Sequence, residues 1–128
     1  MNDEILIKEA QKAMEYSYSP YSNFKVGAAL LCKNGKIYKG CNIENASFSA
    51  TVCAERTAIF KAVSEGEKDG FVCLAIVSSG EDFPYPCGVC RQVFTEFMKD
   101  AYIIVANKKG EYKKFTIEDL MPYSFTEF

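Results

Sequence analysis

Two short cysteine motifs, in a chain without histidine, limit what this sequence can fold into. They are C-A-E at residues 53–55 and P-C-G-V-C at residues 86–90. Without histidine, a transition-metal site must depend on cysteine. Cys87 and Cys90 are three residues apart, which places two thiolates on one face at the start of a helix. Cys53 can supply a third ligand, and three protein ligands leave one tetrahedral position open, as in catalytic zinc sites. The fold must therefore bring the two motifs together.

Glu55 follows Cys53 by two residues, and side chains at this spacing on a helix do not face the same way. We therefore expect Glu55 not to be a fourth ligand and to stand beside a water that the metal activates. Zinc can lower the pKa of a bound water from 15.7 to roughly 7. A nearby carboxylate can take the proton of that water and pass it on. The motif thus predicts a catalytic acid–base group next to a metal.

Other interpretations of the cysteines remain open. A bare C-x-x-C is also typical of a redox dithiol or of half a structural zinc site. A structural site would need a fourth ligand. Cys32 and Cys73 lie in apolar strand patterns and are better interpreted as small buried hydrophobes, but Cys41, at a strand end, is not dismissed. A redox dithiol would not require Glu55.

The bulk composition is that of one soluble globular domain spanning residues 1–128. Hydrophobic residues make up 48% and charged residues 25% of the chain, and no segment resembles a linker. The net charge of −2 argues against a nucleic-acid polymer as partner. No apolar run is long enough for a membrane span, and the acidic start does not resemble a signal peptide. We therefore expect a cytoplasmic protein whose cysteines are reduced.

The hydrophobic pattern alternates between helices and strands. Asn34-Gly35 predicts a hairpin turn, residues 41–50 a polar loop, and Thr51 the N-cap of the helix that follows. We expect helices at 3–16, 52–64 and 87–99, strands at 24–32, 37–41, 71–78, 102–106 and 112–115, and a last helical turn from Thr116. This order predicts an α/β fold with three αβα layers: a mixed sheet of about five strands with helices on both faces. The two motif-bearing helices would begin at the same end of the sheet.

Three thiolates on one Zn²⁺ leave the site with a net charge near −1, which weakens the metal as a Lewis acid. The positive ends of the two helices can offset part of this charge. Arg56 can also donate hydrogen bonds to cysteine sulfurs, although a surface ion pair is the alternative for this residue.

The sequence resembles the small, homotetrameric cytidine deaminases that act on free nucleosides. The resemblance covers nearly the whole chain and is carried by residues 18–30, 40–47, 53–58 and 86–92. The C-x-E and P-C-x-x-C pair alone marks only the wider deaminase superfamily. The resemblance implies deamination of cytidine and 2′-deoxycytidine in pyrimidine salvage, with release of ammonia. It implies one Zn²⁺ per subunit, held by Cys53, Cys87 and Cys90, with Glu55 moving protons.

The resemblance also implies substrate contacts that spacing alone does not suggest. Phe24 would pack on the pyrimidine ring, Asn42 and Glu44 would bind the ribose hydroxyls, and Ala54 would contact the base through its backbone. Phe125 would reach the site of a neighbouring subunit in a homotetramer. From the pattern alone, Phe24 would be a core aromatic and the two polar residues would be solvated loop positions.

Three positions depart from the family pattern: Phe48 stands where tyrosine is frequent, Ala50 where Gly or Pro is frequent, and Val89 where Ala is frequent. We expect small packing changes and no change of reaction. Two rival functions remain: a deaminase of another aminopyrimidine nucleoside such as blasticidin S, and, in a different class, a non-catalytic zinc or dithiol module.

Overall fold

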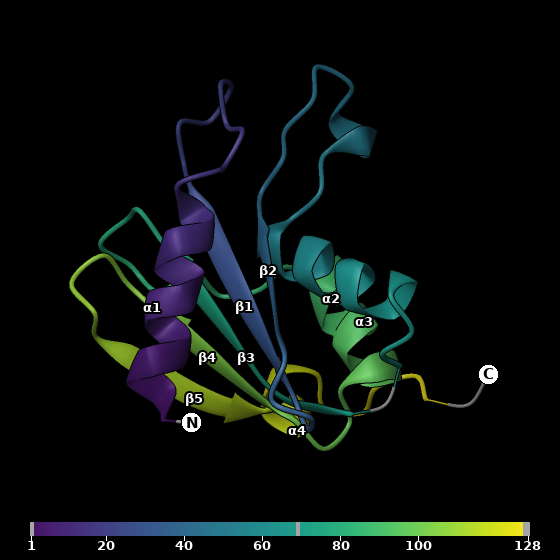
Figure 1. The fold of residues 1–128 in the computed structure, drawn as a ribbon. Helices are drawn as coiled ribbons and strands as arrows, with labels where there is room; N and C mark the ends of the chain where they lie inside the picture. The colour runs from purple at the N-terminus through teal and green to yellow at the C-terminus, as the bar shows by residue number, and fades with distance from the viewer. Residues whose placement is uncertain (1, 69, 127–128) are drawn as a thin grey trace.

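A five-stranded mixed sheet lies between helices in the computed structural model, which describes residues 2–68 and 70–126 (Figure 1). In chain order the elements are α1 (Asp3–Met14), β1 (Val26–Cys32), β2 (Ile37–Cys41), the 3₁₀ helix η1 (Phe48–Ala50), α2 (Ala54–Ser64), β3 (Phe71–Ser78), α3 (Gly88–Phe97), β4 (Tyr102–Ala106), β5 (Tyr112–Thr116) and α4 (Ile117–Leu120).

The strand order is β2-β1-β3-β4-β5. β3 and β4 are parallel, whereas the other neighbouring strands pair antiparallel. α1 covers one face of the sheet, and α2 and α3 cover the other (Figure 1). The predicted three-layer α/β class with a mixed sheet is therefore confirmed. No helix within the described residues is long and apolar enough to cross a membrane.

Strand β3 is central because its side chains are buried on both faces of the sheet. Leu74 and Ile76 point into the core beneath α2 and α3. Cys73, Ala75 and Val77 point into the second core beneath α1. The almost continuous apolar run of this strand is what burial on both faces requires.

Two glycines let helices approach the sheet closely. A Cβ on Gly27 would lie 2.1 Å from the Ala10 carbonyl oxygen of α1. A Cβ on Gly40 would lie 2.5 Å from the Ala58 nitrogen of α2. Because Gly40 lies in β2, its missing side chain sets how near the start of α2 lies to the sheet.

The helix that carries Glu55 begins later than predicted. Thr51 is not its N-cap: Cys53 occupies that position, in an extended conformation, and the helix begins at Ala54. The chain stays extended through Val52 because Val52 and Ile43 exchange two backbone hydrogen bonds of 3.0 Å. Thr51 instead ends η1, a short helix within the stretch predicted to be an irregular loop.

Candidate active site

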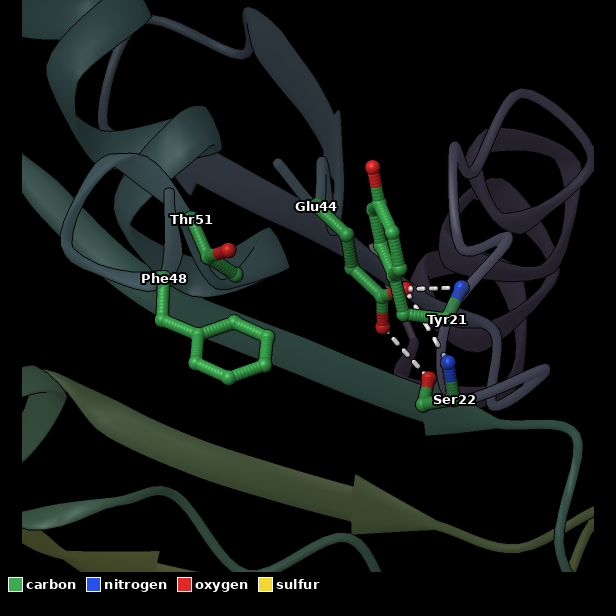
Figure 2. A pocket seen from close by; sticks show the side chains of 5 residues that line it. All are labelled: Tyr21, Ser22, Glu44, Phe48 and Thr51. Carbon is green, nitrogen blue, oxygen red and sulfur yellow. Dashed lines mark hydrogen bonds between the residues drawn. The ribbon is translucent and has the colours of Figure 1, made fainter. Parts of the chain in front are cut away.

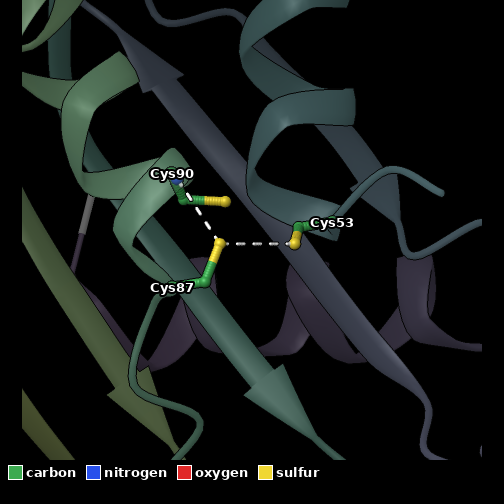
Figure 3. A group of neighbouring side chains, drawn as sticks. All are labelled: Cys53, Cys87 and Cys90. Atoms are coloured by element: carbon green, nitrogen blue, oxygen red, sulfur yellow. Dashed lines mark hydrogen bonds between the residues drawn. The ribbon is translucent and has the colours of Figure 1, made fainter. Parts of the chain in front are cut away.

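The N-terminal ends of α2 and α3 bring three cysteines together (Figure 3). Cys53 is the N-cap of α2, Cys87 is the N-cap of α3, and Cys90 lies in the first turn of α3. Their sulfur atoms all lie within 4.8 Å of one another. The Sγ atoms of Cys53 and Cys87 are 3.8 Å apart. Cys87 was predicted inside the helix, and its position as N-cap leaves its side chain at the helix end, facing Cys53.

This geometry fits zinc. A tetrahedral Zn²⁺ with Zn–S bonds of about 2.3 Å separates its sulfur ligands by about 3.8 Å, which is the Cys53–Cys87 spacing. Within the described part of the chain, no fourth Cys, Asp or Glu joins the group. Cys41, the open candidate for a fourth ligand, lies outside it at the end of β2. The three sulfurs therefore form a site for one zinc ion with a coordination position left for a small molecule.

Arg56 supports the thiolates. Its Nη2 donates a hydrogen bond of 3.4 Å to Cys53 Sγ. The pKa of Cys53 is lowered to about 5, first by the hydrogen bond with Cys90 and further by the hydrogen bond and charge of Arg56. Burial alone would lower the pKa of Arg56, but the hydrogen bonds with the sulfurs of Cys53 and Cys90 outweigh it and raise that pKa above its usual value. Arg56 thus faces the sulfur cluster.

Glu55 is buried, with only 5% of its surface exposed. Burial raises the pKa of its carboxyl to about 7, and the negative charge of Cys53 adds to this rise. The carboxyl lies outside the sulfur group, as the helix spacing predicted. A buried carboxyl that exchanges its proton near neutral pH is suited to acid–base work.

A cavity brings Glu55 together with residues that are distant in sequence. It has a volume of about 240 Å³ and opens between the start of α2, the end of β2 and the loop before α3. Of the predicted site residues, the cavity is lined by Phe24, Asn42, Glu44, Cys53, Ala54, Glu55 and Cys87. Cys90 is fully buried and does not line the cavity. Phe125 is 66% exposed and does not line the described wall of this cavity in its own chain.

Sequence reasoning missed other parts of the wall. Pro84 and Tyr85 line the cavity from the loop that leads to Cys87, whereas Val26 is the first residue of β1 and Ile76 lies within β3. Tyr85 precedes the P-C-x-x-C motif directly, so adjacency to the metal ligands was the available signal. The strand residues carry no signal that separates them from ordinary core positions.

Asn42 is held by both ends of its amide. Its Oδ1 accepts from Ser17 Oγ and, at 3.0 Å, from the backbone nitrogen of Val26. Its Nδ2 donates to the Phe24 carbonyl oxygen at 2.8 Å. An amide has two donors and two lone pairs. One N–H of Asn42 is therefore left for a ligand.

Glu44 is held in a cradle of three donors (Figure 2). The backbone nitrogens of Tyr21 and Ser22 donate to its Oε1 at 2.9 and 3.2 Å. Ser22 Oγ donates to its Oε2. The pKa of Glu44 is lowered, first by the Ser22 hydroxyl and then by the two backbone donors, which outweigh burial. The ionised carboxylate keeps one lone pair free for a ligand, and Glu44 lines the same cavity as Asn42.

Comparison with known proteins places this arrangement in a family. The family described as "Cytidine and deoxycytidylate deaminase zinc-binding region" matches residues 1–106. The chain belongs to the cytidine and deoxycytidylate deaminase family. In this deaminase family, a cytidine deaminase of Sporosarcina psychrophila is 49% identical over 99% of this chain and 93% of its own. A blasticidin-S deaminase of Bacillus cereus is 35% identical over 79% of this chain and 76% of its own.

The fold comparison agrees with this deaminase family. The crystal structure of a cytidine deaminase from Burkholderia pseudomallei superposes with a TM-score of 0.94 at 42% identity. The match covers 98% of this chain and 100% of that one. The resemblance predicted from the sequence is therefore confirmed at the level of family and fold.

Proposed function

We propose that this protein catalyses the zinc-dependent hydrolytic deamination of cytidine and 2′-deoxycytidine to uridine and 2′-deoxyuridine, with release of ammonia. One observation carries the proposal. The buried carboxyl of Glu55 and the sulfurs of Cys53 and Cys87 line the same cavity as Phe24 and Glu44. An acid–base group, a metal site and groups suited to a base and a sugar thus share one space.

In this proposal Glu55 carries the protons. Cys53, Cys87 and Cys90 would hold the zinc ion, which would lower the pKa of a water molecule so that its hydroxide form can attack C4 of cytosine at neutral pH. Glu55 accepts one proton of that water and donates it to N3 of the ring. It then takes the proton of the hydroxyl now bonded to C4 and delivers it to the amine, so that the C4–N bond breaks and ammonia leaves. Its pKa of about 7 suits a group that must both accept and donate at neutral pH. Arg56 offsets the surplus negative charge of the thiolates.

The other cavity residues orient the substrate. The ring of Phe24 packs on the pyrimidine. The free N–H of Asn42 donates to a ribose hydroxyl, and Glu44 accepts from a ribose hydroxyl. A single hydroxyl can satisfy both residues, because it accepts and donates at once. The backbone of Ala54, at the first position of α2, contacts the base.

The direct test follows the absorbance of cytidine mixed with purified protein. We expect the amino-pyrimidine band to disappear, and a strong zinc chelator to abolish the change. A folded, zinc-loaded protein that leaves cytidine unchanged would overturn the proposed reaction. The chelated protein, reloaded with zinc, serves as the control for damage by the chelator.

Two alternatives are separated by the same assay. A panel that includes blasticidin S tests whether another aminopyrimidine is preferred, a question raised by the relative from Bacillus cereus. The pairing of Asn42 with Glu44 in the cavity favours a plain nucleoside. A non-catalytic zinc module would turn over no member of the panel.

We also propose a cytoplasmic homotetramer that serves pyrimidine salvage, with Phe125 completing the site of a neighbouring subunit. Its support is the set of large aromatic side chains exposed on the single chain. Tyr16 and Phe48 are each 80% exposed and Phe125 is 66% exposed, and contacts between subunits would remove such apolar surface from water. All six cysteines are free thiols in the structure, as the reducing cytoplasm favours.

A further inference from the structure

The hydroxyl of Ser22 links two residues of the cavity. The backbone nitrogen of Phe24 donates to Ser22 Oγ at 3.0 Å. Ser22 Oγ in turn donates to Glu44 Oε2 (Figure 2). A hydroxyl has one proton. Because the Phe24 N–H approaches its oxygen, the proton of Ser22 points toward the carboxylate.

The peptide of Phe24 that orients Ser22 is itself fixed. The Phe24 carbonyl accepts from Asn42 Nδ2 at 2.8 Å. The preceding residue, Asn23, has a φ of 59°, in the left-handed region that non-glycine residues rarely adopt. Its backbone nitrogen donates to the Ser19 carbonyl at 3.0 Å, which closes the turn. The hydroxyl therefore belongs to a defined turn.

Without Ser22, the side chain of Glu44 would keep two backbone donors, both on Oε1. The second oxygen, Oε2, has Ser22 as its donor. Two bonds to one oxygen allow the carboxylate to turn about that oxygen, whereas a third bond to the other oxygen fixes its plane. The direction of the lone pair offered to a ligand depends on that plane.

We propose that Ser22 is a positioning residue for sugar recognition: its hydroxyl fixes the plane of the Glu44 carboxylate so that one lone pair meets a ribose hydroxyl. The inference rests on the proposed function, since it assigns Glu44 to the sugar. Ser22 is exposed and lies outside both hydrophobic cores. Its removal therefore costs little packing, and its effect falls on substrate affinity.

The test compares Ser22→Ala with Ser22→Thr, which keeps the hydroxyl. Loss of a hydrogen bond to a charged group should raise the KM for cytidine about tenfold, with kcat changed less than threefold. Ser22→Thr should stay within about threefold of the wild type. Ser64→Ala is the matched control: it removes another exposed serine hydroxyl, one that donates to the Lys61 carbonyl at the end of α2.

A second substrate separates positioning from general damage. On 2′,3′-dideoxycytidine, which keeps the 5′-hydroxyl but lacks the 2′- and 3′-hydroxyls, Ser22→Ala should change KM less than about twofold, because the hydroxyls proposed to meet Glu44 at that edge of the sugar are absent. An unchanged KM for cytidine, or an equal penalty on both substrates, would overturn the inference. If Ser22→Ala fails to fold, Ser22→Cys keeps the shape with a weak donor and should show the same selective loss.

The pKa of Glu44, measured by NMR, provides a second test that does not depend on turnover. It should rise in Ser22→Ala, since the hydroxyl is the largest cause of its lowering. A wild type that turns over no cytidine would overturn the proposed function and, with it, the sugar role of Glu44 on which the inference rests; this pKa would then test only the Ser22–Glu44 hydrogen bond. An unchanged pKa would refute it.

Discussion

Glu55 and Arg56 are neighbours in sequence yet face different partners, because successive helix residues project in different directions. Glu55 turns into the cavity, where burial raises its pKa to about 7. Arg56 turns toward the thiolates and donates to Cys53. At the scale of single residues, the buried carboxyl of Glu55 has a pKa that suits proton exchange, and the guanidinium of Arg56 bonds to the sulfur cluster.

The first prediction concerns Glu55→Gln, which keeps the size of the side chain but cannot accept a proton. We expect kcat to fall about 10³-fold, within the range for loss of general acid–base catalysis, while the bound zinc stays the same. Absorbance assays and metal analysis of the purified variant measure both. Glu65→Gln, at the exposed end of α2, is the control. Turnover within tenfold of the wild type would contradict the role of Glu55.

The second prediction concerns Arg56→Ala. Removal of a group that hydrogen-bonds to a metal ligand should weaken zinc binding about 10- to 100-fold. Competition with a coloured chelator measures the affinity. Arg56→Gln, which keeps N–H donors without the charge, should have a zinc affinity between that of Arg56→Ala and that of the wild type. Wild-type affinity in Arg56→Ala would remove this role.

At the scale of elements, the site depends on where α2 and α3 begin. Each helix starts directly after a cysteine of the proposed metal site, and this cysteine serves as its N-cap. α2 is set against β2 through Gly40. Arg91 of α3 donates, each at 2.8 Å, to the carbonyls of Pro86 and Leu120, which ties the start of α3 to α4. These contacts set the sulfur spacing.

The third prediction therefore concerns Gly40→Ala. Its Cβ would meet backbone atoms of α2 at 2.5 and 2.7 Å, which no side-chain movement can relieve. We expect a loss of about 3 kcal/mol in the free energy of unfolding, at the upper end for overpacking. Urea unfolding with excess zinc measures it. Gly88→Ala, with no atom within 4 Å of the added Cβ, should stay within about 1 kcal/mol of the wild type. Equal effects of the two changes would be evidence against this packing argument.

At the scale of the whole molecule, a zinc ion bound as proposed would join two helices whose cysteine caps, Cys53 and Cys87, are 34 residues apart in the sequence. A ligand that binds only the folded protein stabilises it by mass action. The fourth prediction is that chelation lowers Tm by about 10 °C, the shift expected for a metal at a hundredfold excess over its Kd. The measurement is thermal unfolding of the protein before chelation, after chelation and after zinc is restored. An unchanged Tm would argue against a zinc cross-link.

The fifth prediction tests composite sites. Phe125→Ala and Glu55→Gln, each poorly active alone, are mixed under conditions that exchange subunits. A hybrid then contains sites with an intact Glu55 and a Phe125 supplied by the neighbour, so activity should return to at least about tenfold above either parent. Hybrids that stay as inactive as the separate variants would show that Phe125 does not act across subunits.

Much of the fold could be predicted because its signals are local. The hairpin at Asn34-Gly35 and the two-sided burial of β3 follow from turn chemistry and from hydrophobic periodicity. The start of α2 could not be predicted correctly, because Thr51 is a good N-cap by residue type. Its hydroxyl instead accepts from the Asn45 nitrogen at 3.2 Å, and pairing of Val52 with Ile43 delays the helix.

The roles of the site residues stay predictions. As with the fold, only some of these residues could be singled out from local sequence signals. The cysteine motifs and Glu55 could be singled out because metal ligation and proton transfer need particular residue types at particular spacings. Phe24, Asn42 and Glu44 were reached only through family resemblance, since nothing in their local pattern separates a cavity residue from a loop residue. Tyr85 was missed.

The sequence by itself determined the chemistry that the chain can carry: thiolate ligands, one carboxylate beside them and an alternation of helices and strands. These are properties of residue type and short-range spacing. Only the tertiary structure decided that two helix caps meet at 3.8 Å, that Glu55 is buried, and that Ser22 donates to Glu44. The two contacts join segments that are more than twenty residues apart in the sequence, and the third feature is the burial of a side chain. Long-range contacts and burial arise only when the sheet and its helices pack together.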